Sequence, residues 1–439
     1  MREWLDPDDL AFFVSDAVAQ FDLAEFTASY RRDGRGGAAY DPEMMVALLL
    51  FAYCEGVKSS RQIERRCRRD VAYRVLSRNQ QPDHATIARF RDRHRAALRA
   101  VFVQVLRLCA EAGLVRVGLV ALDGTKLRAD ASGLKNYDID RAVTAIGQVE
   151  KQIEELLTAA ARTDAAEDAA EQDKHDDPPA QLRQRQHRLA ALRAAKDRLA
   201  AQAAEVQRVQ DQRRADYDTA RGKRGVRPAV KPTERALAAA RRTNLTDPDS
   251  RVMHIAGGLM QSFNAQAVVT SGQIVVAAEV VPQAVDYDAF HPMLDAARVA
   301  LDQAGVNEPI RAVVADAGYS SKNNRDHVRA PSDRPIALVA VPTLGGNKQP
   351  DCQDRPDPRF SKDRAFDRAA RRITNPAGRR LYARRKIIIE PVFGQMKQRS
   401  GPRVQHRGRD KVNTEWKMMA AAHNLLKCWR HLRTVQPAH

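Results

Sequence analysis

The chain has 439 residues, of which 44% are hydrophobic, and it carries a formal net charge of +18 at pH 7. This length predicts about two or three domains, and the apolar content is sufficient for real cores. So large a positive charge favours a polyanionic partner, usually nucleic acid. A membrane protein is excluded, because no apolar run reaches the roughly 18 residues that a spanning helix needs.

The positive charge is concentrated in two parts of the sequence. Residues 351–439 contain 22 Lys and Arg against 8 Asp and Glu, a balance of +14. Residues 59–99 contain 12 basic residues against 4 acidic ones. A surface that is basic only for solubility would not be clustered in this way, so both regions are candidates for contact with nucleic acid.

The cysteines and the N-terminal residues indicate the compartment. The five cysteines lie far apart and include no CxxC pair, so neither a zinc ribbon nor a disulfide framework is indicated. The first residues, MREWLDPDDL, are acidic and lack the apolar core of a signal peptide. We therefore expect a reduced, cytoplasmic protein.

Residues 1–115 are predicted to form an N-terminal helical domain. In YDPEMMVALLLFAYCEG, Asp41 is a helix N-cap, Pro42 is the first helical residue and Gly56 is a stop signal. A longer helix is predicted after the cap Asp83, because apolar residues recur there at helical spacing. Short helices rich in arginine are typical of a compact DNA-binding domain. The alternative is a helical dimerisation module whose arginines are solvated.

The pattern then changes twice. Residues 116–140 begin with VGLVALDG, an apolar run from Val117 to Gly124 that predicts a buried strand ending at Asp-Gly. Residues 141–241 are rich in Ala, Gln, Glu and Arg, and predict an antiparallel helical hairpin or coiled coil with a basic linker. Its predicted apolar stripes are Val143, Ile146, Val149, Ile153 and Leu156, and Leu189, Leu192, Lys196, Leu199, Ala203 and Val206.

Residues 242–439 are predicted to complete an α/β domain. Two Val-rich runs joined by Ser271-Gly272 predict a β-hairpin, and DYDAFHPMLDAARVALDQAG predicts a capped helix. IRAVVADAGYSS (310–321) and PIALVAVP (335–342) predict two more strands, and the basic tail from about Phe366 predicts helices. Without the hairpin of residues 141–241, this order predicts a mixed sheet with helices on its faces.

Two aspartates are the first candidate site residues. Asp123 and Asp316 each follow an apolar strand and stand beside or near a glycine. Ligands of open α/β sheets bind at the carboxyl ends of the strands, so neighbouring strands would bring these carboxylates together. Each aspartate alone could equally belong to an ordinary turn.

A divalent metal ion would compensate the repulsion between two converging carboxylates. Their hard oxygen ligands suit Mg²⁺, for which Mn²⁺ can substitute. Glu390, in the basic stretch RRKIIIEPVFGQMKQRSG, is the candidate third carboxylate, although it could instead be a simple salt-bridge partner. Two ions about 3.5–4 Å apart would stabilise both oxygens of a phosphodiester displacement.

Basic residues flank Glu390 and could hold a DNA strand. Arg385, Lys386 and Lys397 are the candidates on this segment, and Lys126, close to Asp123, could also touch DNA. Pro391 lacks a backbone N–H and predicts that the helix begins or bends near Glu390.

Four segments resemble the DDE transposases of bacterial insertion sequences. They read LDGTKLRADAS, NLTDPDSRVMH…FNAQAVV, VVADAGYSS and RRKIIIEPVFGQMK. The segment YDPEMMVALLLFAYCEGVKSSRQIERRCRRDVAYRVLS…PDHATIARFRDRH resembles the N-terminal helical domain of that family. The resemblance covers residues from about 39 to 428.

The resemblance implies an RNase H-like catalytic fold with Asp123, Asp316 and Glu390 as catalytic acids and metal ligands. It also implies Mg²⁺, binding to terminal inverted repeats and target DNA, and work as an oligomer, a dimer when two ends are synapsed. Lys397 stands at the family's offset after Glu390. Tyr382, with Arg385, is a further candidate for DNA contact, but this pair lies one residue further from the glutamate than is usual, whereas Lys386 has the usual offset.

Three functions remain open at this point. The first is a transposase that cuts and joins the ends of its own element in the cytoplasm of a bacterium, at the nucleoid. The second is another RNase H-like enzyme, such as a structure-selective nuclease. The third is a catalytically silent DNA-binding protein. The predicted helical hairpin could serve oligomerisation or could clamp DNA.

Overall fold

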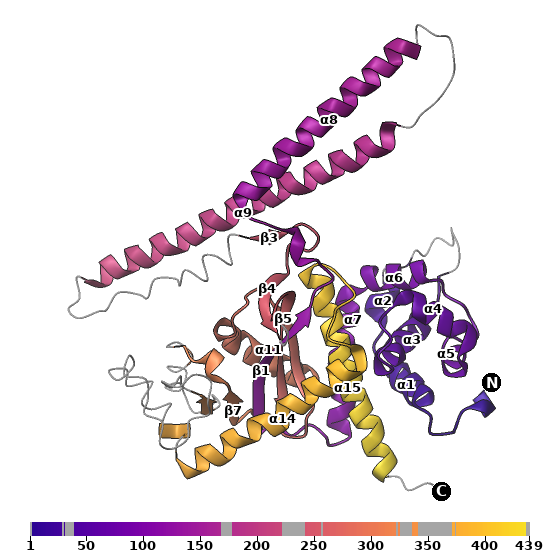
Figure 1. Cartoon of the computed structure of the whole chain (residues 1–439). Helices are drawn as coiled ribbons and strands as arrows, with labels where there is room; N and C mark the ends of the chain where they lie inside the picture. Colours follow the sequence, from indigo (N-terminus) through magenta and orange to yellow (C-terminus); the bar gives the residue numbers. More distant parts are fainter. Residues whose placement is uncertain are drawn as a thin grey trace. The chain divides into compact units, whose positions relative to one another are not determined.

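The computed structural model describes residues 2–28, 30, 39–167, 178–221, 242–255, 258–321, 324, 336–340, 371–373 and 375–435. Two compact units divide the chain (Figure 1). The first joins Met1–Ala129 to Phe263–His439, and the second is Asp130–Ser262. The predicted strands at 335–342 and the predicted helical tail from Phe366 lie partly outside the described residues.

The N-terminal part of the first unit is helical, as its sequence predicted. Its helices are η1 (Arg2–Trp4), α1 (Leu10–Ala19), α2 (Ala24–Thr27), α3 (Pro42–Cys54), α4 (Ser60–Arg69), α5 (Val71–Leu76), α6 (His84–Arg93) and α7 (Arg95–Glu111). Two predicted caps are confirmed: the Asp41 side chain accepts from the N–H of Glu43, and that of Asp83 from the N–H of Thr86. The cap predicted in DYDAFHPMLDAARVALDQAG was wrong, because the helix there follows Ala289 and has no side-chain cap. Gly56, just after α3, has φ 77°, a left-handed conformation that ends a helix without strain.

One long helix after Asp83 was predicted, and this was wrong because the helix breaks at His94. The backbone there has φ −105° and ψ 30°. The His94 ring packs against the rings of Phe90 and Phe26, with centroids 4.6 and 5.2 Å away. The break is thus stabilised by aromatic packing from another helix, which the local spacing of apolar residues does not contain.

The mixed sheet is confirmed. Among the described residues its strands are β1 (Leu119–Arg128), β4 (Arg251–Ile255), β5 (Gly258–Thr270), β6 (Val275–Val281), β7 (Ala312–Ala315) and β8 (Ile336–Val339). The order is β4-β5-β1-β7-β8, with β6 paired to β5. The β5–β6 hairpin is antiparallel, whereas β1, β7 and β8 pair in parallel, which is the RNase H-like mixed arrangement that was expected.

Helices from the second half of the chain cover the sheet. They are η3 (Tyr287–Ala289), α11 (Phe290–Gln303), η4 (Ala317–Tyr319), α14 (Pro376–Ser400) and α15 (Arg409–Val435). Helices α11 and α15 contact β6, while α14 contacts β1 and β7. Helix α15 also packs on α3 and α7, so the N-terminal helices share a core with the sheet. Trp416 of α15 is fully buried and donates to the carbonyl of Gln266 on β5.

Strand β1 is longer than predicted. Its predicted end at Gly124 was wrong, because the strand continues through Asp123-Gly124 to Arg128. Backbone hydrogen bonds extend it there: Arg128 donates to Pro402 and accepts from Val404. The strand stays paired in the sheet between β5 and β7, so Asp-Gly here lies inside a strand and not in a turn.

Helix α14 was expected to begin or bend near Pro391, but it begins at Pro376 and includes Pro391 in its interior. Asn375 caps it by accepting from the N–H of Gly378. Its apolar face, which includes Ile389, Val392 and Met396, is buried. This burial offsets the hydrogen bond that an interior proline removes.

The second unit contains the hairpin of helices α8 (Ile139–Glu167) and α9 (Pro178–Arg221), with the short strands β2 (Asn136–Tyr137) and β3 (Thr243–Asn244) (Figure 1). The helices run antiparallel, since Glu150 pairs with Arg193 and Gln152 with Arg185. The core of the unit consists of Tyr137, Ala142, Ala145, Val149 and Leu192, with Ile146, Ile153, Leu189 and Leu245 against it.

Three positions of the predicted apolar stripes were wrong. Lys196 is exposed and Ala195 is buried in its place, Ala203 is exposed, and Val143 is 51% exposed. Leu192, Ala195 and Leu199 follow one another at helical spacing, so a one-residue shift moves the charged Lys196 to solvent.

Within the described ranges, no helix is long and apolar enough to cross a membrane. The described cysteines, Cys54, Cys67, Cys109 and Cys428, are buried and free. Cys352 lies outside the described residues.

A buried ion pair ties the turn before α4 to α15 within the first unit. Lys58 Nζ lies 3.2 Å from Glu415 Oε1, and both side chains are almost fully buried. Burial alone would raise the pKa of Glu415, but the hydrogen bond from His406 and the charge of Lys58 lower it. Lys58 also donates to the carbonyl of Arg403 at 2.6 Å.

Replacing this lysine should destabilise the first unit. Lys58→Met leaves a buried carboxylate without its main counter-charge, so urea unfolding should show a loss on the order of 3 kcal/mol. The control is Lys411→Met, which removes the partner of the exposed Asp92 and should cost less than about 1 kcal/mol. Equal losses in the two variants would contradict the role given to burial.

Candidate active site

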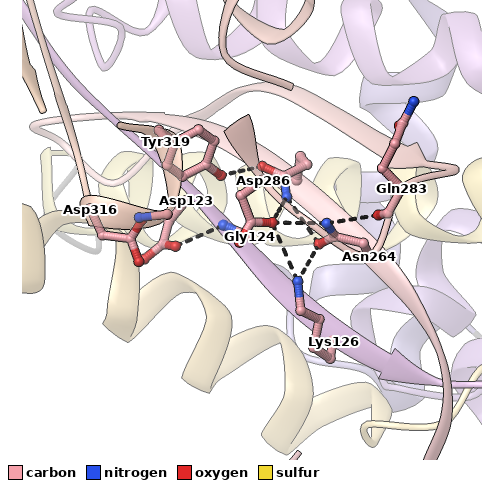
Figure 2. Close-up of polar contacts among 10 residues, drawn as sticks. Asp123, Gly124, Lys126, Asn264, Gln283, Asp286, Asp316 and Tyr319 are labelled. Atoms are coloured by element: carbon pink, nitrogen blue, oxygen red, sulfur yellow. Dashed lines mark hydrogen bonds and ion pairs between the residues drawn. The ribbon is translucent and has the colours of Figure 1, made fainter. Parts of the chain in front are cut away.

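Neighbouring parallel strands bring the two predicted aspartates together. The β1–β7 ladder ends with Leu122 opposite Ala315, so the next residues along the strands are Asp123 and Asp316. Figure 2 shows their side chains next to each other. Asp316 begins the short helix η4, and its Oδ1 accepts from the N–H of Gly318 at 2.8 Å.

The two carboxylates destabilise each other's charged form. The pKa of Asp123 is raised from 3.8 to about 6, because burial and the charge of Asp316 raise it by more than Arg385 lowers it. Burial also raises the pKa of Asp316, against the N–H of Gly318 and the charge of Arg385. Such a pair gains from any cation that is brought between or beside its oxygens.

Helix α14 supplies a cation from the protein itself. Arg385 Nη1 lies 2.6 Å from Asp123 Oδ2, and Nη2 lies 3.7 Å from Glu390 Oε1. The guanidinium is mostly buried, and its Nε is a buried atom without a hydrogen-bond partner. Arg385 therefore lies between the first and third predicted acids and neutralises part of their charge.

The three predicted acids do not form a closed metal cage in this structure. The Glu390 side chain is 52% exposed and reaches Asp123 only through the guanidinium of Arg385. No group of three or more His, Cys, Asp or Glu that could hold a metal ion occurs among the residues that the structure describes. The pair Asp123 and Asp316 still fits a hard divalent cation, because its oxygens are close, buried and under-compensated.

The predicted DNA-contacting residues differ in how far they are exposed and in whether they lie against the acids. Tyr382 is buried beside Arg385, while Lys386, with the family's usual offset, is exposed to solvent. Lys397 is half-buried, and burial together with the positive charge of Lys126 lowers its pKa. The structure thus places Arg385, not Lys386, against the acids, and brings Lys126 and Lys397 near each other.

A polar cluster beside the acids was missed in the sequence. Asp286, in the loop between β6 and η3, accepts hydrogen bonds through Oδ1 from Asn264, Gln266 and Lys126 (Figure 2). Gln266 Oε1 in turn accepts from the hydroxyl of Tyr319, which follows Asp316 on η4. The segments FNAQA and DYDAF carried a signal, because polar residues in or after a buried strand need partners.

Gly124 allows this cluster to approach β1. A side-chain carbon there would lie 2.3 Å from Gln266 Nε2 and 2.9 Å from Asp286 Oδ1. The glycine that seemed to end a strand is therefore needed for close packing.

Two family models match the chain. The transposase domain family DUF772 matches residues 1–93, and a transposase DDE domain matches residues 349–429, which include Arg385, Glu390 and Lys397. No curated protein and no solved structure matches the chain. The matches at both ends confirm the resemblance to DDE transposases of insertion sequences.

Neutralising Asp123 should stabilise the metal-free protein at neutral pH. Its folded-state pKa is raised from 3.8 to about 6, so ionisation above that pH opposes folding. Asp123→Asn should therefore raise the free energy of unfolding at pH 7.5 in EDTA by on the order of 2 kcal/mol. Between about pH 4 and pH 6 the native state binds more protons than the unfolded state. The wild type should therefore lose stability as the pH rises through this range, and the variant should lose less.

Urea unfolding at pH 7.5 and at about pH 4 measures this effect. Most of the gain should disappear at the lower pH, where the carboxyl is protonated in the native state and about half protonated in the unfolded state. A variant that is less stable than the wild type at pH 7.5 would show that the ion pair with Arg385 outweighs burial and repulsion.

Adding a methyl group at Gly124 should disrupt the polar cluster. Gly124→Ala forces Gln266 or Asp286 to move, so we expect a loss of about 2 kcal/mol or more in thermal or urea unfolding. Gly394→Ala on α14 is the control, since no atom lies within 4 Å of the added carbon. That change should be neutral or stabilise by up to about 1 kcal/mol.

Proposed function

We propose that the chain is a DNA transposase that binds the terminal inverted repeats of its insertion sequence and catalyses strand cleavage and strand transfer. The observation that carries the proposal is the buried pair Asp123 and Asp316, which helix α14 faces with Arg385. That helix lies within the match to a transposase DDE domain.

Asp123 and Asp316, with Glu390 as the third acid, would hold Mg²⁺ or Mn²⁺, two ions in the family's scheme. Bound there, the ions would lower the energy of the charge that develops on the phosphate and the leaving oxygen. Glu390 is half-exposed and contacts Arg385. In the proposal its carboxylate leaves the guanidinium and binds the metal ion instead.

The basic residues would hold the DNA strand. In the proposal Arg385, next to the acids, binds the phosphate at the cleaved position, and Lys397 and Lys126 contact neighbouring phosphates. Tyr382 supports Arg385 from the same face of α14, and the exposed Lys386 contacts the DNA backbone further out. Arginine suits the first role because its planar guanidinium can bind two oxygens at once.

The proposed reaction needs no covalent bond between protein and DNA. In cleavage, a water oxygen bonds to phosphorus as the bond to the 3′ oxygen breaks, and that oxygen leaves as a hydroxyl after taking a proton. In strand transfer, the freed 3′-hydroxyl attacks a phosphate of the target DNA in the same way. Holding both oxygens in line is the main task of the site.

DNA recognition and assembly complete the proposal. We assign the N-terminal helices to binding double-stranded DNA, because α4 carries exposed Arg61, Arg65 and Arg69 on one side. The α8–α9 hairpin leaves Val143 and Leu157 about half exposed, which suits a dimer that synapses two ends. The place of work would be the nucleoid in a bacterial cytoplasm.

A cleavage assay on DNA with the inverted repeats that flank this gene tests the proposal. The wild type and the variants Asp123→Asn and Glu390→Gln are compared with Mg²⁺ and with EDTA. We expect metal-dependent nicking at the repeat ends by the wild type, a loss of at least about a hundredfold in both variants, and unchanged DNA binding by gel shift. Glu111→Gln, an exposed acid at the end of α7, should cleave like the wild type.

Other outcomes separate the alternatives. Metal-dependent cutting that ignores the repeats would favour a structure-selective nuclease. Tight binding without cleavage by any of the proteins would favour a silent DNA-binding protein. Full activity of Glu390→Gln would remove Glu390 from the site.

A further inference from the structure

A fourth carboxylate, Asp286, stands beside the acid pair in a fixed position. Its Oδ1 is 2.8 Å from both Asn264 Nδ2 and Gln266 Nε2, and 3.3 Å from Lys126 Nζ. Three donors on one oxygen immobilise the side chain, although it belongs to a loop (Figure 2). The side chain of Asp286 is therefore held in one position.

The other oxygen of Asp286 faces the acid pair. Oδ2 lies 3.4 Å from the position that a side-chain carbon at Gly318 would occupy, and the same position is 3.0 Å from Asp316 Oδ1. The network also reaches the η4 turn itself, because the Tyr319 hydroxyl donates to Gln266. Asp286 is therefore linked to the turn that carries Asp316, and its charge acts on that carboxylate.

Lys126 places a positive charge next to the carboxylate of Asp286. Its Nζ bonds Asn264 Oδ1 at 2.8 Å as well as Asp286, and the side chain is only 22% exposed. A lysine held by two acceptors is part of the protein's own charge pattern. Because Lys126 bonds Asp286, whose other oxygen lies beside Asp316, both members of the pair lie close to the proposed cation site.

We propose that Asp286 and Lys126 form a charge pair that sets the affinity of the Asp123–Asp316 site for divalent cations, Asp286 strengthening and Lys126 weakening it. Asp286 is a positioning residue that acts by its charge and does not ligate the ion. This inference rests on the proposed function, because it takes Asp123 and Asp316 as the cation's ligands.

The physical reason is the long reach of charge in a partly buried site. A carboxylate a few ångströms beyond the ligands attracts a doubly charged ion, and at an effective dielectric between protein and water one charge changes affinity about tenfold. Salt screens this little, since the separation is well below the Debye length of about 10 Å.

The test is Mn²⁺ binding to the full chain without DNA, followed by electron paramagnetic resonance of free Mn²⁺. Asp286→Asn keeps the shape and an acceptor oxygen but removes the charge, so Mn²⁺ should bind about tenfold more weakly. Lys126→Met removes the opposing charge, so Mn²⁺ should bind several-fold more tightly. The double variant should fall between the two single ones.

Two controls accompany these variants. Asp302→Asn removes an exposed carboxylate at the end of α11 and should bind Mn²⁺ like the wild type. Asp123→Asn should lose most Mn²⁺ binding, and thermal melting should show that each protein is folded. If Asp286→Asn does not fold, Lys126→Met still decides, because misfolding cannot produce tighter binding.

The outcomes distinguish this inference from the proposed function. If Asp123→Asn loses Mn²⁺ while Asp286→Asn and Lys126→Met both bind like the wild type, the charge pair has no such role and the site itself stands. Weaker binding by Lys126→Met would also overturn the inference. If the wild type and Asp123→Asn bind Mn²⁺ equally, the metal site of the proposed function fails, and the inference with it.

Discussion

The repulsion between two buried carboxylates is the constraint on which the rest of the site depends. The parallel ladder between β1 and β7 brings Asp123 and Asp316 to the same level of adjacent strands, and burial raises the pKa of both. Positively charged residues nearby compensate part of this repulsion, and Arg385 does so most directly through its ion pair with Asp123. A divalent cation would do so more completely, which is why the arrangement suits phosphoryl chemistry.

Helix α14 contributes both a positive and a negative side chain to the candidate site. Helix α14 carries Arg385 and Glu390 five residues apart, and the guanidinium spans from Asp123 toward the glutamate. In the absence of DNA the arginine thus neutralises the acids, and in the proposed function it turns to phosphate. Because the helix packs against β1 and β7, the groups it presents are held against the strand ends.

The sheet tolerates a large insertion between two of its strands. The chain leaves the first unit after β1, forms the α8–α9 hairpin in Asp130–Ser262, and returns within β5. Asn264 and Gln266, just after this return, bond Asp286 and so take part in the polar cluster beside the acids. The part of β5 that belongs to the first unit therefore connects directly to the site.

The sequence by itself determined the structural features that depend only on residues close together in the chain. The caps Asp41 and Asp83, the hairpin at Ser271-Gly272 and the aspartate after β7 were all predictable, because capping, turn geometry and apolar periodicity are local. The motifs around Asp123, Asp316 and Glu390 also indicated the transposase class, which the family matches confirm.

Only the tertiary structure decided the features that depend on contacts between residues far apart in the chain. The break at His94 is stabilised by aromatic packing, and β1 passes Gly124 as a strand paired within the sheet, with residues 402–404 bonded to its last residue. The choice of Arg385 over Lys386, and the place of Asp286 beside Asp316, depend on which side chains face one another across the sheet. Long-range contacts set these features, since the same residues in a local window are equally compatible with a solvated helix face or an ordinary loop.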